Sequence, residues 1–181
     1  MNDLIAYAKG LSGTLEWKNG SNPKIVQMFA DAGHPEVVND DTAWCAAFVG
    51  SVLKHCGYEN TRSLLAKSYL NFGEVVDPIN MTAGDIVIWQ RGDSTWQGHV
   101  EFVVSRRGAF VDVIGGNVQD QVRAYTRRID NKLLGVRRPI KTSLNKLQPA
   151  PTAVQVAKHP ATVSIFAAII AAIAYYFGVS K

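Results

Sequence analysis

The chain has 181 residues, of which 47% are hydrophobic and 19% charged, and it carries a formal net charge of +4. This length allows one ordinary domain with something left over, and the composition excludes a wholly disordered chain or a low-complexity fibre. The charge is uneven, because residues 1–104 carry 7 Lys/Arg against 12 Asp/Glu and residues 105–148 carry 10 against 3. The basic half suits solvated strand faces, which we favour, or an anionic partner such as a cell-wall polymer. No arginine–aromatic or helix-turn-helix pattern indicates nucleic-acid binding.

Helices are predicted in the first part of the chain. Asn22 is a suitable N-cap, Pro23 suits the first helical position, and Gly33 suits the end of the same helix. A short amphipathic helix is expected before it, and two further helices are expected after it. The predicted helices cover residues 3–10 and 23–33, a segment that begins after residues 40–42 and stops at Gly57, and residues 61–72.

The hydrophobic pattern changes after residue 84 to short β-branched runs separated by turn residues. Helices followed by a meander of strands predict an α+β domain with an antiparallel sheet. The strands are expected over residues 85–89, 99–104, 109–114, 122–127 and 133–137.

A hydrophobic segment stands apart near the C-terminus. Residues 148–152 contain two prolines and are typical of a linker. Residues 161–179 contain no charge and sixteen apolar side chains, and as a helix they would span roughly 28 Å, close to a bilayer core. The sequence therefore predicts a domain at 1–140, a linker at 141–160 and a transmembrane helix at 161–179, whose small residues would permit self-association. No cleavable secretory signal is visible.

The two cysteines have different settings. Cys45 falls near the start of the third predicted helix, where exposed N–H groups and the helix dipole stabilise a thiolate, the reactive form of a cysteine nucleophile. Cys56 lies eleven residues further along the same helix, roughly 16 Å away, which is beyond disulfide reach. Free thiols and a reducing compartment are expected, with Cys56 structural and Cys45 either a nucleophile or a small core residue.

Two further residues complete a possible catalytic set. His99 opens a predicted strand, where an imidazole is able to reach a thiol at a helix start and act as a base. Asn117 follows two glycines at the end of the next strand and is a candidate to orient that imidazole, although such a residue is also typical of a turn. No spaced set of metal ligands and no phosphate-binding glycine loop is present, so no metal or cofactor is expected.

Taken together, the ordered blocks resemble the CHAP and NlpC/P60 group of cysteine peptidoglycan hydrolases, in particular a subgroup found in phage endolysins. The blocks that carry the resemblance are residues 41–50, 84–89, 98–103 and 115–117, preceded by Asn22-Pro23 and followed by residues 135–139. The resemblance covers about residues 8–140 and implies a papain-like fold.

The resemblance also implies roles for individual residues: Cys45 as nucleophile, His99 as general base and Asn117 as the orienting residue. Glu101 departs from the family, which often has a small residue there, and its carboxylate either acts on the imidazole or substrate or faces solvent. The other candidates near the site are Asp41 as a helix cap or polar wall, Trp44 as packing, and Trp96 as a substrate contact.

The resulting functional hypothesis is an endolysin that cleaves a stem-peptide amide or the lactyl amide of peptidoglycan. Its predicted location is the host inner membrane, anchored through residues 161–179, with the periplasmic wall as substrate. The alternatives are a membrane-tethered cysteine protease or acyltransferase, and a wall-binding module without catalysis.

Overall fold

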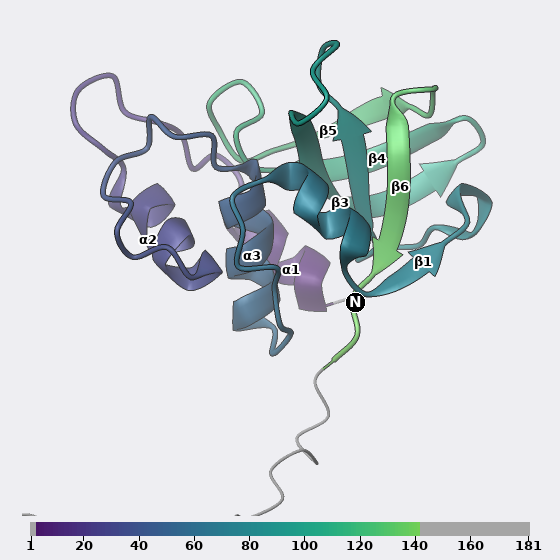
Figure 1. The fold of residues 1–181 in the computed structure, drawn as a ribbon, viewed down its shortest axis with the longest axis horizontal. Helices are drawn as coiled ribbons and strands as arrows, with labels where there is room; N and C mark the ends of the chain where they lie inside the picture. Colours follow the sequence, from purple (N-terminus) through teal and green to yellow (C-terminus); the bar gives the residue numbers. More distant parts are fainter. Residues whose placement is uncertain (1–2, 142–181) are drawn as a thin grey trace, which may run out of the picture. The chain divides into compact units, whose positions relative to one another are not determined.

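The computed structural model describes residues 3–141 of the chain (Figure 1). The predicted linker from residue 142 onward and the predicted membrane helix lie outside these residues. Within residues 3–141, no helix is long and apolar enough to cross a membrane.

Three α-helices precede the sheet: α1 spans Asp3–Gly10, α2 Pro23–Ala32 and α3 Cys45–His55. The predicted ends of α2 are confirmed, because the Asn22 side chain accepts the N–H of Lys24 and Gly33 closes the helix at φ 101°. In Figure 1, α3 lies between α2 and the sheet, so its two sides are covered and nine of its eleven residues are buried. This burial fixes the position of the helix start.

The predicted fourth helix is wrong. Only a 3₁₀ helix forms, η1 at Ala66–Asn71, and a second short one, η2, covers Pro78–Asn80. The Ser68 hydroxyl bonds the Thr61 hydroxyl at 2.8 Å. Side-chain bonds of Ser and Thr compete with regular helix in this way.

Six strands form one antiparallel sheet in the order β1-β6-β2-β3-β4-β5. The predicted meander is confirmed to within a few residues at each end, and β1, which the sequence pattern did not indicate, adds an edge through pairing with β6. The strands are β1 Glu74–Val76, β2 Ile86–Gln90, β3 Gly98–Arg107, β4 Phe110–Gly115, β5 Arg123–Arg128 and β6 Leu133–Arg138.

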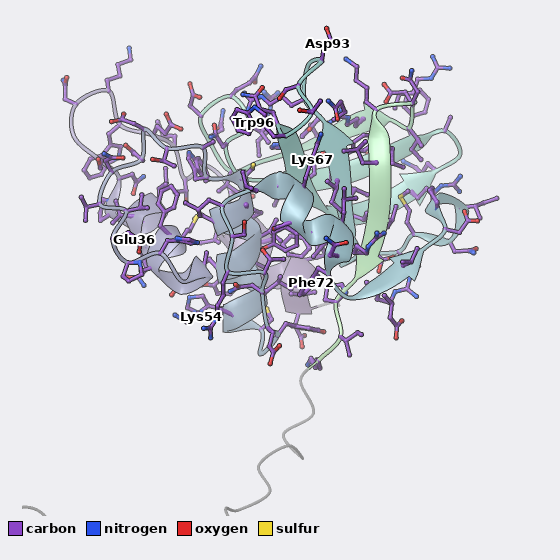
Figure 2. The ribbon with its side chains drawn as sticks, viewed as in Figure 1. Glu36, Lys54, Lys67, Phe72, Asp93 and Trp96 are labelled. Atoms are coloured by element: carbon purple, nitrogen blue, oxygen red, sulfur yellow. The ribbon has the colours of Figure 1, made fainter. Side chains whose placement is uncertain are left out.

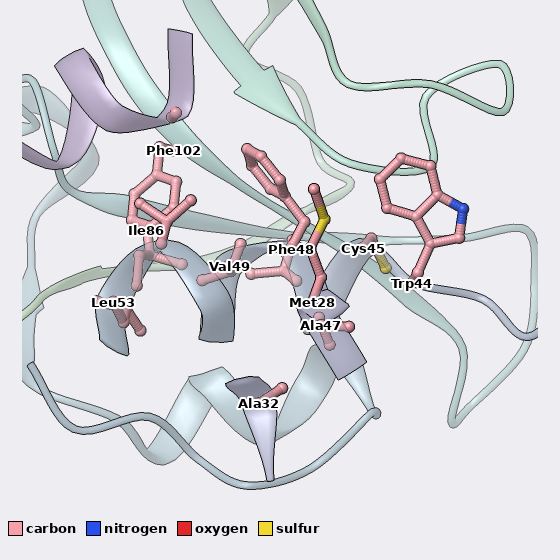
Figure 3. Close-up of a cluster of buried hydrophobic side chains, with 14 of the residues drawn as sticks. Met28, Ala32, Trp44, Cys45, Ala47, Phe48, Val49, Leu53, Ile86 and Phe102 are labelled. Carbon is pink, nitrogen blue, oxygen red and sulfur yellow. The ribbon is translucent and has the colours of Figure 1, made fainter. Parts of the chain in front are cut away.

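The sheet is apolar on both faces. Alternate side chains such as Val100 and Phe102 of β3 pack with the helices in the larger core, part of which is drawn in Figure 3. Trp89 of β2 and Val103 of β3 belong to a smaller core. His99 and Glu101 have the same strand parity as Val103, so they are on the side of the smaller core.

Two of the sequence blocks are tied together by an ion pair. Asp85, before β2, is almost fully buried, and Arg138 at the end of β6 donates to both its oxygens at 2.8 Å. This bidentate pair joins chain segments 53 residues apart. Arg137 donates to the Leu70 carbonyl beside it. The basic residues near position 138 therefore fasten the last strand.

Candidate active site

Cys45 is the first residue of α3, as the sequence indicated. The N-cap position is Trp44, with no side-chain capping bond, so the expectation that Asp41 caps this helix is wrong. The reason is spacing, because Asp41 stands four residues before the helix begins and its side chain is exposed. The first N–H groups of α3 therefore have no capping side chain and are available to an anion.

Trp44 is fully buried, in keeping with its predicted packing role. Its indole N–H donates to Glu16 Oε1 at 2.7 Å, which ties the segment after α1 to the start of α3. Figure 3 shows Trp44 and Cys45 side by side at one end of the buried cluster.

His99, the second residue of β3, interacts with Cys45, and this interaction shifts the pKa of both side chains. Burial disfavours both charged forms, raising the pKa of the thiol and lowering that of the imidazole. The interaction of the two side chains outweighs burial, so the pKa of Cys45 lies below its ordinary value and the pKa of His99 rises to about 9. Backbone bonds from Val100 and Ala46 also stabilise the sulfur anion. The arrangement suits a thiolate–imidazolium pair, which we call the Cys45–His99 pair.

Glu101 is a buried carboxylate next to this pair. Its side chain is 0% exposed, and Oε2 lies 3.4 Å from His99 Nε2. That distance is longer than a typical charge-assisted hydrogen bond, and Oε2 makes no hydrogen bond with any described residue. Apo catalytic contacts are often long in this way. The nearby carboxylate and its negative charge add to the effect of Cys45 in raising the pKa of His99. The alternative of a solvent-facing Glu101 is therefore wrong.

Asn117 is not in hydrogen-bond contact with His99 within the described part of the chain; the interactions that raise the pKa of His99 come from Cys45 and Glu101. β4 ends at Gly115, and Asn117 follows in a left-handed conformation at φ 55°. This backbone conformation is the one expected of a turn residue, the alternative that the sequence also allowed for Asn117. Its orienting role stays a prediction.

The two glycines before Asn117 shape the site. A Cβ at Gly115 would lie 3.1 Å from Glu101 Oε2 and 3.3 Å from His99 Nε2. A Cβ at Gly116 would lie 2.4 Å from Phe48 Cβ and 2.7 Å from the Trp44 ring. Both backbones have negative φ, so these positions require close approach rather than a special turn.

A cavity of about 110 Å³ is lined in part by Cys45, although the residue is only 3% exposed. Trp96, in the loop between β2 and β3, forms part of its wall and is 62% exposed. Lys67 donates to the Thr95 carbonyl at 2.6 Å and holds this loop from η1, and Figure 2 labels Lys67 and Trp96 close to one another. The lining residues are Ala43, Cys45, Leu64, Leu65, Ala66, Arg91, Trp96, Gln97 and Gly98.

Among residues 3–141, no three His, Cys, Asp or Glu side chains come together as metal ligands. The sequence reasoning named Cys45 and Trp96, which line this cavity, and His99, which interacts with Cys45. It did not find Arg91 and residues 64–66 in the cavity wall, because these depend on how η1 packs against the loop after β2.

The structure thus brings together a cysteine at a helix start, an imidazole on an antiparallel strand and a buried carboxylate on an α+β scaffold. Residues 37–117 match the family model of the CHAP domain, so the resemblance seen in the sequence is confirmed over this part of the chain. No curated protein matches. A domain of this family indicates hydrolysis or binding of peptidoglycan.

Solved structures show the same fold in the NlpC/P60 family. The P60 domain of an antigen from Mycobacterium avium paratuberculosis is 12% identical with a TM-score of 0.50, over 77% of this chain and 92% of that one. An NLP/P60-family protein similar to a lipoprotein, from Staphylococcus aureus, is 16% identical with a TM-score of 0.50, over 77% of this chain and 41% of that one. At these identities the likeness shows the fold alone.

A third structure, RipD from Mycobacterium tuberculosis, is described as a non-catalytic NlpC/p60 domain protein with an adaptation to peptidoglycan binding. It is 16% identical with a TM-score of 0.48, over 76% of this chain and 95% of that one.

Proposed function

We propose that this domain hydrolyses an amide bond of peptidoglycan by nucleophilic catalysis at Cys45. The observation that carries the proposal is the Cys45–His99 pair, in which the pKa of the thiol is lowered, that of the imidazole is raised, and Cys45 lines a cavity. A cysteine that served only for packing would need neither an imidazole partner nor a cavity beside it.

In the proposed reaction the Cys45 thiolate forms a bond to the carbonyl carbon of the amide. The N–H groups at the start of α3 stabilise the oxyanion. The His99 imidazolium gives its proton to the nitrogen as the C–N bond breaks, which releases the amine and leaves a thioester. A water molecule then attacks the thioester, His99 accepts its proton, and the C–S bond breaks to restore the thiolate and release the carboxylic acid.

We assign the orienting role in this mechanism to Glu101 rather than to Asn117. Glu101 Oε2 faces Nε2 of the ring, so Nδ1 is the nitrogen left for the sulfur. A buried carboxylate on the far side of an imidazole fixes the ring and stabilises its charged form, as in other nucleophile–base–acid sets.

The cavity supports a substrate with a small apolar group beside the scissile carbonyl. Its wall is mainly apolar, its volume is about 110 Å³, and Arg91 is its one charged lining residue among those that the structure describes. An alanyl or lactyl methyl group fits this description, so both the stem-peptide and the lactyl amide remain candidates. Exposed Trp96 at the wall offers a flat surface to the rest of the substrate.

The wider setting we propose is cell lysis by a phage endolysin, held at the host inner membrane through residues 161–179. The support is the sequence alone: an uncharged, apolar segment of bilayer length after a proline-containing linker. Cell fractionation with protease protection of the N-terminal domain tests this; recovery of the full chain in the soluble fraction would contradict it.

The test of the proposed activity compares Cys45→Ala with Cys56→Ala in the full chain. Cys56 is the matched control, since it is the other free cysteine and has no such setting. Clearing of purified cell walls should be lost in the first variant and kept in the second, with unchanged thermal unfolding in both. Wall clearing by Cys45→Ala would end the proposal. Mass spectrometry of the released muropeptides identifies the amide and separates hydrolysis from acyl transfer or proteolysis.

A further inference from the structure

The buried carboxylate of Glu101 has a second set of contacts, on the side away from the active site. Its other oxygen, Oε1, accepts a hydrogen bond from the Tyr125 hydroxyl at 3.2 Å. Arg127 Nη1 lies 3.7 Å from the same oxygen. The two oxygens of Glu101 thus have different surroundings, because Oε2 faces the imidazole and Oε1 faces two donors from β5.

These donors reach Glu101 across an intervening strand. β4 lies between β3 and β5, and Tyr125 and Arg127 are two residues apart on β5, so they project from the same face. Their partners on β4 are Val113 and Val111, which have short side chains. Gly115, further along β4, adds no side chain at all beside Glu101.

Arg127 is itself held in place by an aromatic ring. Its guanidinium carbon lies 3.8 Å from the centroid of the Trp89 ring, and Trp89 is fully buried. Trp89 is the strand partner of His99 in the β2–β3 register. The guanidinium is therefore stacked on the residue next to the imidazole, and cation–π contact of this kind fixes its plane.

From this geometry we propose that Tyr125 and Arg127 are positioning residues of the active site, which hold the Glu101 carboxylate directed at His99. A carboxylate with no solvent exposure is costly to keep charged without cations and donors. In the Cys45–His99–Glu101–Arg127 series, charges of −, +, − and + follow one another from α3 to β5. The series is neutral as a whole, which suits a buried site. The role of these two residues in catalysis rests on the proposed function. The experiment below does not, because it measures the pKa of His99 and not hydrolysis.

The other groups around Glu101 do not substitute for this support. β2 contributes no titratable side chain over Ile86–Gln90. On β4 the single acid, Asp112, accepts bonds from Ser105, Thr126 and Arg107 instead. The titratable or charged groups that contact Glu101 within the described residues are therefore His99, Tyr125 and Arg127.

The experiment is an NMR titration of the His99 ring in the full chain, with histidine labelled and His99→Ala used for assignment. Arg127→Gln should lower the pKa of His99 by about one unit, because without the guanidinium the Glu101 carboxylate is no longer held facing the ring and supports the imidazolium less. Arg127→Lys should restore most of the shift. Arg128→Gln, which removes the neighbouring exposed arginine, is the matched control and should leave the titration unchanged.

Tyr125→Phe gives the second arm, since it removes only one hydroxyl and keeps the ring in the smaller core. It should shift the titration in the same direction by less than Arg127→Gln, and it carries the test if Arg127→Gln does not fold. Titrations of Arg127→Gln or Tyr125→Phe that coincide with that of Arg128→Gln, or move to higher pH, would overturn the inference. Because the readout is a proton on His99, a failure of wall hydrolysis would leave this result readable and would count against the proposed function alone.

Discussion

Two places in the molecule combine a buried acid with a histidine, and only one of them has the features of a catalytic site. Between α2 and α3, Asp31 Oδ2 lies 3.0 Å from His55 Nε2. In the sheet, Glu101 Oε2 lies 3.4 Å from His99 Nε2. The shorter contact is the less suited to catalysis, so distance between acid and base does not decide the matter.

The difference lies on the other side of each imidazole. The ring of His55 stacks on Tyr7 with centroids 4.8 Å apart, and the nearby Ser51 donates its hydroxyl to Asp31 rather than to His55. Within residues 3–141, no nucleophile is thus paired with that imidazole. His99 interacts with both Cys45 and Glu101. A contact between an acid and a histidine is therefore expected to be structural unless the imidazole also interacts with a nucleophile.

The largest expected effect tests this contrast at its two candidate nucleophiles. Cys45→Ala should lower wall hydrolysis by at least about 10³-fold, the scale seen when a nucleophile is removed. Ser51→Ala should leave the rate within about twofold, because it loses only one hydrogen bond to Asp31. The measurement is the initial rate of wall clearing by equal amounts of folded protein. A similar loss of wall-clearing rate in both variants would contradict the distinction between the catalytic and the structural histidine.

Removing the charge of the acid beside His99 is expected to have the next largest effect. Glu101→Gln should reduce the rate by about 100-fold, since the amide no longer stabilises the imidazolium. The parent protein should be active from the low pKa of Cys45 up to the pKa of His99 at about 9, and activity should fall above that pH as the imidazolium is lost. In Glu101→Gln this upper limit should move down. An unchanged pH–rate profile would count against the role of Glu101.

A smaller effect is expected from crowding the same contact. Gly115→Ala places a methyl group 3.1 Å from Glu101 Oε2 and 3.3 Å from His99 Nε2, which should displace the ring and lower the rate by about tenfold. Gly116→Ala is the comparison, since its methyl group meets Phe48 and Trp44 instead. It should lower the melting temperature more than Gly115→Ala does. Equal rates in Gly115→Ala and the parent would show that a methyl group at this position does not disturb the contact between Glu101 and His99.

The smallest effect on the reaction is expected at the structural acid. Asp31 is almost fully buried and bonded by Gln27, Ser51 and Lys54, and these bonds lower its pKa although burial opposes them. Asp31→Asn should cost about 1–3 kcal/mol of unfolding free energy, measured in urea, while the pH–rate profile keeps its shape.

The pH dependence of that stability has a definite sign. Because the pKa of Asp31 is lowered in the folded protein, its contribution is complete above the unfolded value near 4 and is lost as pH falls through the folded value. The stability difference between the parent and Asp31→Asn should therefore shrink in acid. A difference that grows below pH 4 would contradict this.

Local signals in the sequence were enough for the elements that carry Cys45 and His99. The start of a helix and the start of a strand are marked by neighbouring residues, as Asn22 and Gly33 mark α2. β1 could not be predicted, because its three residues form a strand only through pairing with β6, a distant segment of the chain.

The same limit applies to the support of the imidazole. Asn117 was predicted beside His99 because it ends the following strand. The contacts with Glu101 instead come from Tyr125 and Arg127, and these depend on the register of β3, β4 and β5 together. The alternation of side chains along a strand predicted that Glu101 and His99 lie on the same face of β3. It did not predict whether that face of the sheet is buried. Only the assembled sheet shows what lies across from a side chain.

The open sheet leaves two strands with unpaired backbone groups, β1 and β5. An edge of this kind is a template for the strand of another molecule and hence for aggregation. β1 is only three residues long, and β5 carries arginine at positions 123, 127 and 128 of its six residues. A second copy of β5 aligned on the first would bring like charges together. The exposed Arg123 and Arg128 are therefore charges of the kind that disfavours pairing of this edge with another strand.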